Sequence, residues 1–222
     1  MIVSRDEVIS GVASLVHNNA GCCFLRKGEF VFESSISDDV DLLVSESVNV
    51  TLWDYLKAIG FKKKVDSNFF NVYLYGSKPH VHYVNRDLNL HFDCVSGLFH
   101  KSVHLLREPG FEVTHWVPLD KLIQEESIRD IRSLEVNGRT INCLKLEVEL
   151  VHLIAHVVLD KKGQVDSYYK ARITYLLSQS DMEQVKMMLN LVFFNFSEYL
   201  IRCIHDEKFD SLFEEYLSYG DY

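Results

Sequence analysis

The sequence predicts an α+β fold, in which a mixed β-sheet with flanking helices is followed by a mostly helical C-terminal half. Short apolar runs of strand length alternate with helical patterns up to about residue 95. From Lys145 onward the apolar residues recur with helical spacing instead. The chain has only 3 prolines and no low-complexity stretch, so no flexible linker between the two halves is expected. We therefore expect two closely packed domains, residues 1–115 and 116–222, the second closing over a cleft in the first.

The first predicted elements are a helix and a short buried strand. Ser4 and Glu7 have the spacing of a capping box, and apolar residues at helical spacing then continue to about Asn18. The run "CCFLR", residues 22–26, is typical of a short buried strand. This strand delivers three residues to a turn: Arg26, Lys27 and Gly28.

The next elements continue the alternation of strands and helices. The run "VDLLV", residues 40–44, predicts a strand, and "TLWDYLKAIG" predicts a helix that stops at Gly60. Three further strands are predicted, at residues 70–75, 81–84 and 88–95. An Asn-Gly turn predicts a hairpin over residues 134–144. Two later helices have candidate N-caps: Asp166 or Ser167, and Ser180 with Glu183.

Three aspartates are predicted to meet on one face of the sheet. Residues two apart in a strand point to the same side, which places Asp39 and Asp41 together, roughly 6.5 Å apart. In the later strand an apolar face, Leu88, Leu90, Phe92 and Cys94, alternates with a polar one, Asn89, His91 and Asp93. If the two strands are neighbours, Asp93 joins the earlier pair.

Three carboxylates so close together need positive charge between them. A hard divalent cation with oxygen ligands supplies it, and Mg²⁺, which also accepts phosphate oxygens, is the natural choice. The alternative is that Asp39 and Asp41 are simply the solvated start of a strand.

The order of these motifs resembles the nucleotidyltransferase superfamily, typified by small antibiotic-modifying and minimal nucleotidyltransferases. The family motif is an apolar strand, Gly-Gly or Gly-Ser, then Asp-x-Asp before apolar residues, and a third Asp on a later strand. This chain has "FLRKGEF", "SDDVDLLV" and "LHFDCV" in that order. Poorly characterised bacterial members, often found with surface-glycan or capsule genes, look closer still. The matching residues are Leu25, Arg26, Gly28, Asp39, Asp41, Gly60, Phe61, His152 and His156.

The resemblance implies transfer of a nucleoside monophosphate from a nucleoside triphosphate such as ATP to an acceptor hydroxyl, releasing pyrophosphate. Asp39 and Asp41 would hold Mg²⁺, as two ions, and the triphosphate, while Asp93 would complete the metal site and activate the acceptor. Arg26, Lys27 and Gly28 would bind the nucleotide. A sugar, an aminoglycoside-like alcohol and a protein hydroxyl all remain open as acceptors.

One departure from the family pattern stands beside the nucleotide turn. Glu29 replaces the usual Ser or Gly, and an acid there repels a triphosphate unless its side chain turns away. This leaves open a non-catalytic binding module with the same fold. A metal-dependent phosphohydrolase that uses the histidines of the later helix is a third alternative.

That later helix, "KLEVELVHLIAHVVLD", carries a polar stripe on an otherwise apolar surface. The stripe consists of Glu149, His152, His156 and Asp160. It is either hydrogen-bonded between the halves or lines the cleft, where Glu149, His152 or His156 could orient the acceptor. In the next helix Lys170 and Arg172 could reach the donor phosphates, with surface positions as the alternative.

The composition limits the partners and the compartment. A formal charge of −9 argues against a nucleic-acid partner, because such binding depends on lysines and arginines that neutralise phosphates. Five cysteines without a C-x-x-C pair indicate reduced thiols rather than a disulfide framework. Apolar runs fall short of the roughly 20 residues of a membrane span, so a cytoplasmic protein is expected. The stripe "MMLNLVFFNF" is either core or a homodimer face.

Overall fold

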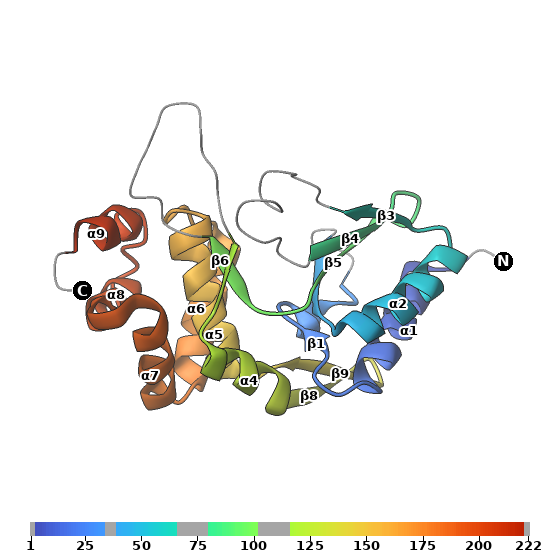
Figure 1. Cartoon of the computed structure of the whole chain (residues 1–222), viewed down its shortest axis with the longest axis horizontal. Coiled ribbons are helices and arrows are strands. Elements are labelled where there is room, and N and C mark those ends of the chain that lie inside the picture. The colour runs from blue at the N-terminus through green and yellow to red at the C-terminus, as the bar shows by residue number, and fades with distance from the viewer. Residues whose placement is uncertain (1–2, 34–38, 66–79, 102–115, 220–222) are drawn as a thin grey trace. The chain divides into compact units, whose positions relative to one another are not determined.

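The computed structural model describes four stretches of the chain, residues 3–33, 39–65, 80–101 and 116–219 (Figure 1). These stretches form two compact units. Unit 1 holds the described residues from 3 to 65, from 80 to 98 and from 125 to 145. Unit 2 holds those from 99 to 124 and from 146 to 219. The predicted closure of one part over the other stays a prediction.

Unit 1 is built on a mixed sheet of seven strands, in the order β3-β4-β5-β2-β1-β9-β8. The strands are β1 (Cys23–Phe24), β2 (Asp39–Leu43), β3 (Lys62–Val65), β4 (His80–Asn85), β5 (Leu90–Val95), β8 (Ile131–Val136) and β9 (Arg139–Leu144). β2 pairs in parallel with β5, and β1 with β9, whereas the other neighbours are antiparallel. This confirms the predicted α+β class with a mixed sheet.

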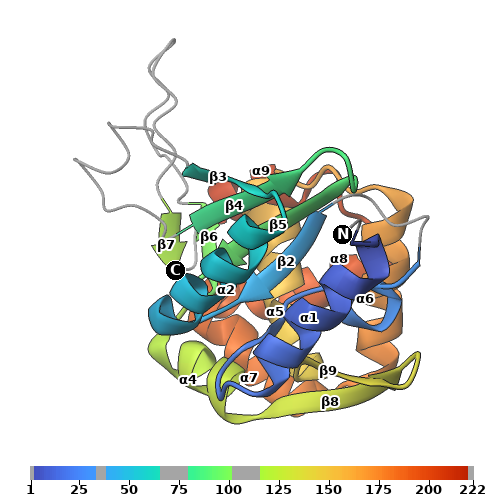
Figure 2. The ribbon, with the colours of Figure 1, turned by 90° about the vertical axis from the view of Figure 1, so that its right-hand side faces the viewer.

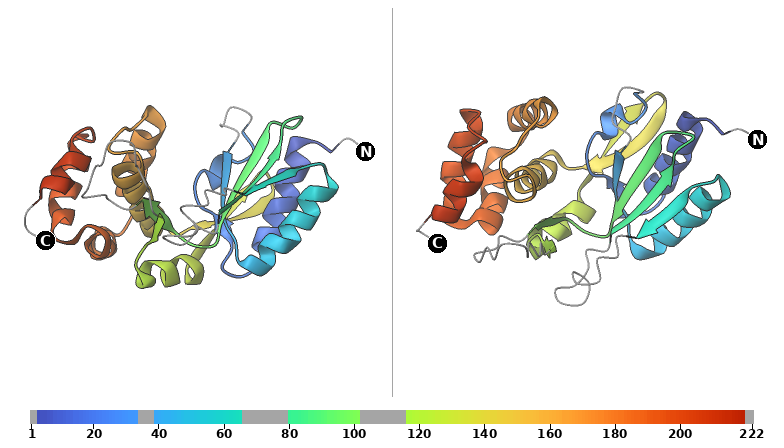
Figure 3. Two further views of the ribbon diagram at one scale, coloured as in Figure 1. Left: turned by 45° about the horizontal axis from the view of Figure 1, so that its top comes forward. Right: turned by 90° about the horizontal axis from the view of Figure 1, so that it is seen from above.

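Two helices cover one face of this sheet, α1 (Arg5–His17) and α2 (Glu46–Ala58) (Figures 2 and 3). The predicted capping box is present, with Ser4 and Glu7 bonded to each other's backbone. The two helices bury apolar residues such as Val12 and Leu52 against Phe24, Leu42 and Phe92 of the strands. Because strand side chains alternate, burying this face leaves the polar side chains of β2 and β5 on the other face.

The alternation in β5 follows the prediction inside the strand but fails at its start. Leu90, Phe92 and Cys94 are buried, and His91 and Asp93 are partly exposed. The predicted strand residue Asn89 instead lies in a turn with φ +49°, so the strand begins at Leu90. An asparagine tolerates this left-handed conformation better than most residues, which makes it a turn residue here.

The hairpin β8–β9 is present with the predicted Asn-Gly turn. Asn137 and Gly138 both have positive φ, 51° and 70°, as the tight turn between twisted strands requires. The predicted strand at residues 70–75 lies outside the described residues.

Unit 2 is mostly helical, as the period of the sequence predicted. Its elements are β6 (Phe99–Lys101), β7 (Trp116–Pro118), α5 (Leu146–Ala155), the π-helix η2 (His156–Asp160), α6 (Ser167–Gln179), α7 (Met182–Phe193), η3 (Phe194–Phe196), α8 (Ser197–His205) and α9 (Leu212–Ser218). The helix α4 (Lys121–Arg129) and a 3₁₀ turn, η1 (Gly28–Phe30), complete the elements of the described residues.

Of the two N-caps predicted for the later helices, one is confirmed and one is wrong. Asp166 caps α6 by accepting a hydrogen bond from the backbone N–H of Tyr169. At α7 the cap is Asp181, which accepts from the backbone N–H of Glu183, and not Ser180. Both Ser and Asp are good N-caps, so the sequence alone could not choose between neighbours.

Within the described residues, one stretch is long and apolar enough to span a membrane by length and composition, Met182–His205. Charged residues such as Lys186 and Glu198 interrupt it, so it is not an uninterrupted apolar run of the roughly 20 residues that a membrane span needs. Its most apolar window is 56% buried inside the protein, as in an ordinary core helix. Phe194, with φ +52°, also separates α7 from α8 within it.

Candidate active site

The strands β2 and β5 bring the predicted aspartates onto one face of unit 1. Asp41 pairs with Asp93, and Asp39 pairs with His91, in the parallel ladder. Neighbouring strands lie about 4.8 Å apart, and paired residues point to the same side. The condition for convergence, that the two strands are neighbours, is therefore met. The Asp41 and Asp93 side chains are partly buried, whereas that of Asp39 is 62% exposed.

Arg26 contacts Asp41 directly. Arg26 donates from Nε and Nη2 to Oδ2 of Asp41, at 3.0 and 2.8 Å. The position of Arg26 follows from the sheet, because the backbone N–H of the preceding Leu25 donates to the Asp41 carbonyl. A cationic side chain thus stands at the end of β1, beside the acids.

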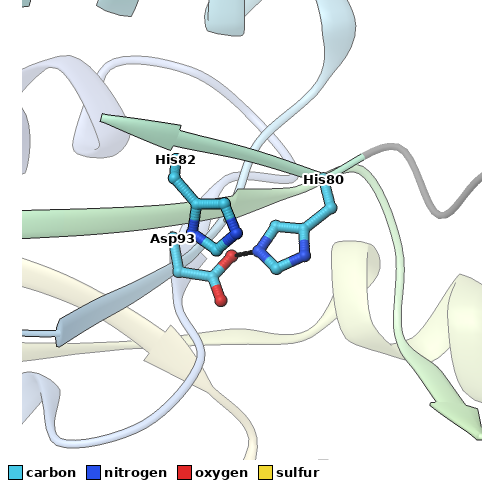
Figure 4. A group of neighbouring side chains, drawn as sticks. All are labelled: His80, His82 and Asp93. Carbon is cyan, nitrogen blue, oxygen red and sulfur yellow. Dashed lines mark ion pairs between the residues drawn. The ribbon is translucent and has the colours of Figure 1, made fainter. Parts of the chain in front are cut away.

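Three histidines surround the acids, and only one of them, His91, was noticed in the sequence. His91 Nδ1 lies 2.5 Å from Oδ1 of Asp39, and His91 Nε2 lies 2.8 Å from Nδ1 of His82. His80 forms an ion pair with Asp93 (Figure 4). His80 and His82 come from β4, which pairs with β5 so that His82 stands opposite Asp93.

These contacts weaken the electrostatic need for a metal ion. The sequence suggested that a cation must separate the three carboxylates. In the structure Arg26 stands beside Asp41, and a histidine stands beside each of Asp39 and Asp93. Arg26 therefore supplies part of the required positive charge, and the case for a metal depends on the carboxylate ligands themselves.

The turn that follows β1 is tightly constrained. Lys27 has φ +59°, and Gly28 is buried in η1. A Cβ on residue 28 would lie 2.3 Å from Sγ of Cys143 in β9, so only glycine fits without movement. The Glu29 carboxylate, a departure from the family pattern, accepts a hydrogen bond from Nη2 of Arg132 at 3.0 Å. Its charge is therefore paired.

The polar stripe of α5 and η2 has its partners inside unit 2. The Glu149 carboxylate is bonded by Nε and Nη2 of Arg172, at 2.7 and 2.6 Å, and both side chains are nearly fully buried. His156 contacts Asp160 at 2.7 Å and Tyr169 at 3.3 Å. Asp160 also accepts a hydrogen bond from the backbone N–H of Lys101, which lies in the predicted first half, whereas the contacts given for Glu149 and His156 stay within the second half.

The remaining predicted residues of unit 2 are also placed. His152 is buried, at 8% exposure, and the ammonium of Lys170 lies 5.9 Å from the ring of Phe209. Buried Arg172 is held by Glu149, which gives both residues a structural role. Nucleotide binding by Lys170 and Arg172, and acceptor orientation by Glu149, His152 and His156, stay predictions.

Comparison with known proteins identifies the fold. The chain is similar to the solution structure of the antibiotic-resistance factor ANT(2'')-Ia, an antibiotic nucleotidyltransferase, with a TM-score of 0.54 and 12% sequence identity. The similarity covers 93% of this chain and 99% of that one. The chain has a nucleotidyltransferase-type fold. No family model and no curated protein matches the sequence.

The nucleotidyltransferase-type fold was predicted from the order of the short motifs, and the structural similarity confirms it. Within this fold, the turn at Arg26 to Gly28 and the acids Asp39, Asp41 and Asp93 all lie in unit 1. His80 and His82 were missed. The available signal was His82 inside the predicted strand at residues 81–84 and His80 directly before it, two residues apart and next to the strand that carries Asp93.

Proposed function

We propose that the protein is a metal-dependent nucleotidyltransferase that moves a nucleoside monophosphate from a nucleoside triphosphate to an acceptor hydroxyl. The observation that carries this proposal is the register of β2 and β5, which sets Asp41 beside Asp93 on the neighbouring strand, with Asp39 on the same face. The fold supports the general class of reaction.

The donor set suits Mg²⁺, because it offers carboxylate oxygens, which this ion prefers. Asp39, Asp41 and Asp93 would hold it. When bound, Mg²⁺ neutralises charge on the transferring phosphate and on the attacking and leaving oxygens. Arg26, fixed beside Asp41, adds a permanent positive charge at the same place.

The turn at Lys27 and Gly28 would contact the triphosphate of the donor. Glu29 is less of an obstacle than its sequence position suggests, because Arg132 pairs with its carboxylate. An Arg-paired acid repels a phosphate far less than an isolated one. We therefore retain donor binding as part of the proposal.

Asp93 is the proposed base for the acceptor hydroxyl, whose proton would pass to its carboxylate as the oxygen attacks the α-phosphorus. His80 is paired with Asp93 and could take part in orienting it. Pyrophosphate leaves. The similarity to an antibiotic-resistance factor makes small polyhydroxylated molecules the first acceptors to test, with sugars and protein hydroxyls next.

The experiment follows a label in the α-phosphate of each nucleoside triphosphate into a panel of acceptors, in the presence of Mg²⁺. Transfer should be abolished in Asp41→Asn and retained in Asp54→Asn, an exposed acid of α2 in the same unit. Inorganic phosphate released from the triphosphate without an acceptor, measured in a separate assay, would instead support the phosphohydrolase.

A second candidate, a non-catalytic binding module, is favoured by one observation. Arg26 and His91 already contact Asp41 and Asp39, so these acids have partners without a metal. If the protein is such a module, the labelled nucleotide should not be transferred to any acceptor, whether or not it binds.

A further inference from the structure

We propose that His80, His82 and Asp93 form a binding site for Zn²⁺, which differs in ligand chemistry from the Mg²⁺ site and shares Asp93 with it. Figure 4 shows the three side chains pointing toward one another, His80 and His82 from β4 and Asp93 from β5. Each offers a ligand atom, and these atoms all lie within 4.8 Å of one another.

The strand register creates this cluster. His80 and His82 are two residues apart in β4 and therefore point to the same side. His82 stands opposite Asp93 in the antiparallel ladder with β5. Ligands about 2.0–2.2 Å from a tetrahedral Zn²⁺ lie roughly 3.4 Å from one another. Small rotations of side chains on two rigid strands would bring the three atoms to that spacing.

The ligand types favour Zn²⁺ over Mg²⁺. Imidazole nitrogen binds Zn²⁺ and related transition metals, whereas Mg²⁺ takes oxygen ligands. Two histidines and one carboxylate make three protein ligands. They leave the fourth coordination position of a tetrahedral Zn²⁺ to water or a substrate atom, as in catalytic zinc sites. Asp93 alone is common to both metals, and Asp39 and Asp41 stay with the oxygen-ligated ion.

A chain of contacts behind the cluster supports this assignment. Nδ1 of His82 lies 2.8 Å from Nε2 of His91, whose Nδ1 lies 2.5 Å from Asp39. Histidines that bind metals usually hold their second nitrogen in such a bond, which fixes the orientation of the ring. Binding of Zn²⁺ through Nε2 of His82 would keep this chain intact.

The ion pair between His80 and Asp93 also supports a metal site. Nε2 of His80 and Oδ1 of Asp93 face each other in a partly buried position, with side-chain exposures of 11% and 22%. A cation held between this imidazole nitrogen and this carboxylate oxygen would be bound by two groups that already face each other. The site is therefore formed by groups that already converge.

Zinc should also affect catalysis, and this consequence rests on the proposed function. If Asp93 activates the acceptor, Zn²⁺ held by Asp93 competes with that role and inhibits transfer. Zinc binding itself is measured on the protein without nucleotide, so its failure is distinct from a failure of the proposed reaction.

The test titrates Zn²⁺ into the untagged full-length protein in competition with a chromophoric chelator, with Mg²⁺ in excess. One equivalent should bind to the wild type, and affinity should fall at least 10-fold in His82→Gln and in Asp93→Asn. His205→Gln, at an exposed histidine of α8, is the matched control and should bind like the wild type. Circular dichroism confirms that each variant is folded.

A second measurement needs no variant. Co²⁺ substituted into the wild type should give the intense visible absorption of a tetrahedral site with nitrogen ligands, and Zn²⁺ should remove it. Less than one equivalent of zinc, an equal loss in His205→Gln, unchanged affinity in His82→Gln, or no such absorption would each overturn the proposal.

Discussion

Asp41 of β2 and Asp93 of β5 occupy the same position on two neighbouring parallel strands, although 51 residues separate them in the sequence. Their side chains share the face of the sheet that α1 and α2 leave uncovered. Each also has a basic neighbour, Arg26 for Asp41 and His80 for Asp93. The proposed metal and nucleotide site depends on this arrangement.

Gly28→Ala should destabilise the protein by about 1–3 kcal/mol, because the new Cβ would meet Sγ of Cys143 at 2.3 Å. Chemical denaturation measures the loss. In a Cys143→Ala background the same substitution should cost less than half as much, since the clashing sulfur is gone. An equal cost in both backgrounds would contradict the packing explanation.

Arg132→Gln should weaken binding of a nucleoside triphosphate by roughly 3- to 10-fold, because it leaves the Glu29 carboxylate without its guanidinium beside the phosphates. Calorimetric titration measures the affinity. Adding Glu29→Gln to this variant should restore most of the binding. A double variant as weak as the single one would show that Arg132 acts otherwise than by pairing with Glu29.

Arg172→Met should destabilise the protein by about 3–5 kcal/mol, because it leaves the buried Glu149 carboxylate without its cationic partner. Thermal or urea unfolding measures the change. The double variant Arg172→Met with Glu149→Leu should recover most of the loss, since neither charge is then buried. If the single and double variants are equally unstable, the ion pair is not the cause.

Asp160 should make the stability of the protein depend on pH in the acid range. Burial alone would raise the pKa of Asp160, but the hydrogen bond and charge of His156, the backbone N–H of Lys101 and the charge of His152 outweigh it. The folded pKa therefore lies below the ordinary value of 3.8. The ionised carboxylate of Asp160 therefore stabilises the folded protein above pH 3.8, and this stabilisation is lost as the pH falls through the folded pKa.

Urea unfolding of wild type and Asp160→Asn at several pH values checks this sign. The wild type should be the more stable protein at pH about 5, and the difference should shrink by pH about 2. A difference that grows as the pH falls would contradict the lowered pKa.

The sequence allowed the acids to be predicted because their signal is local. Alternation of apolar and polar residues places Asp39 and Asp41 on one side of β2, and Asp93 on one side of β5. The apolar runs around them indicate buried strands. Only the pairing of β2 with β5, which joins distant parts of the chain, had to come from the structure.

The histidines of β4 could not be assigned by the same reasoning. Their part in the site depends on the register of β4 against β5, which sets His82 opposite Asp93. That register follows from the turn, where Asn89 adopts a positive φ instead of starting the strand. The polar stripe of α5 was likewise visible, but its partner Arg172 lies 23 residues away on another helix.

Calorimetric titration of the protein with each nucleoside triphosphate, with and without Mg²⁺, shows whether the aspartates of β2 hold a metal and a nucleotide. We expect Mg²⁺-dependent binding of at least one nucleotide to the wild type and to the control Asp54→Asn, and at least a 10-fold loss in Asp39→Asn and Asp41→Asn, since these carboxylates would hold the ion. Binding that is unchanged in both site variants, or no binding to the wild type, would contradict a Mg²⁺ and nucleotide site at Asp39 and Asp41.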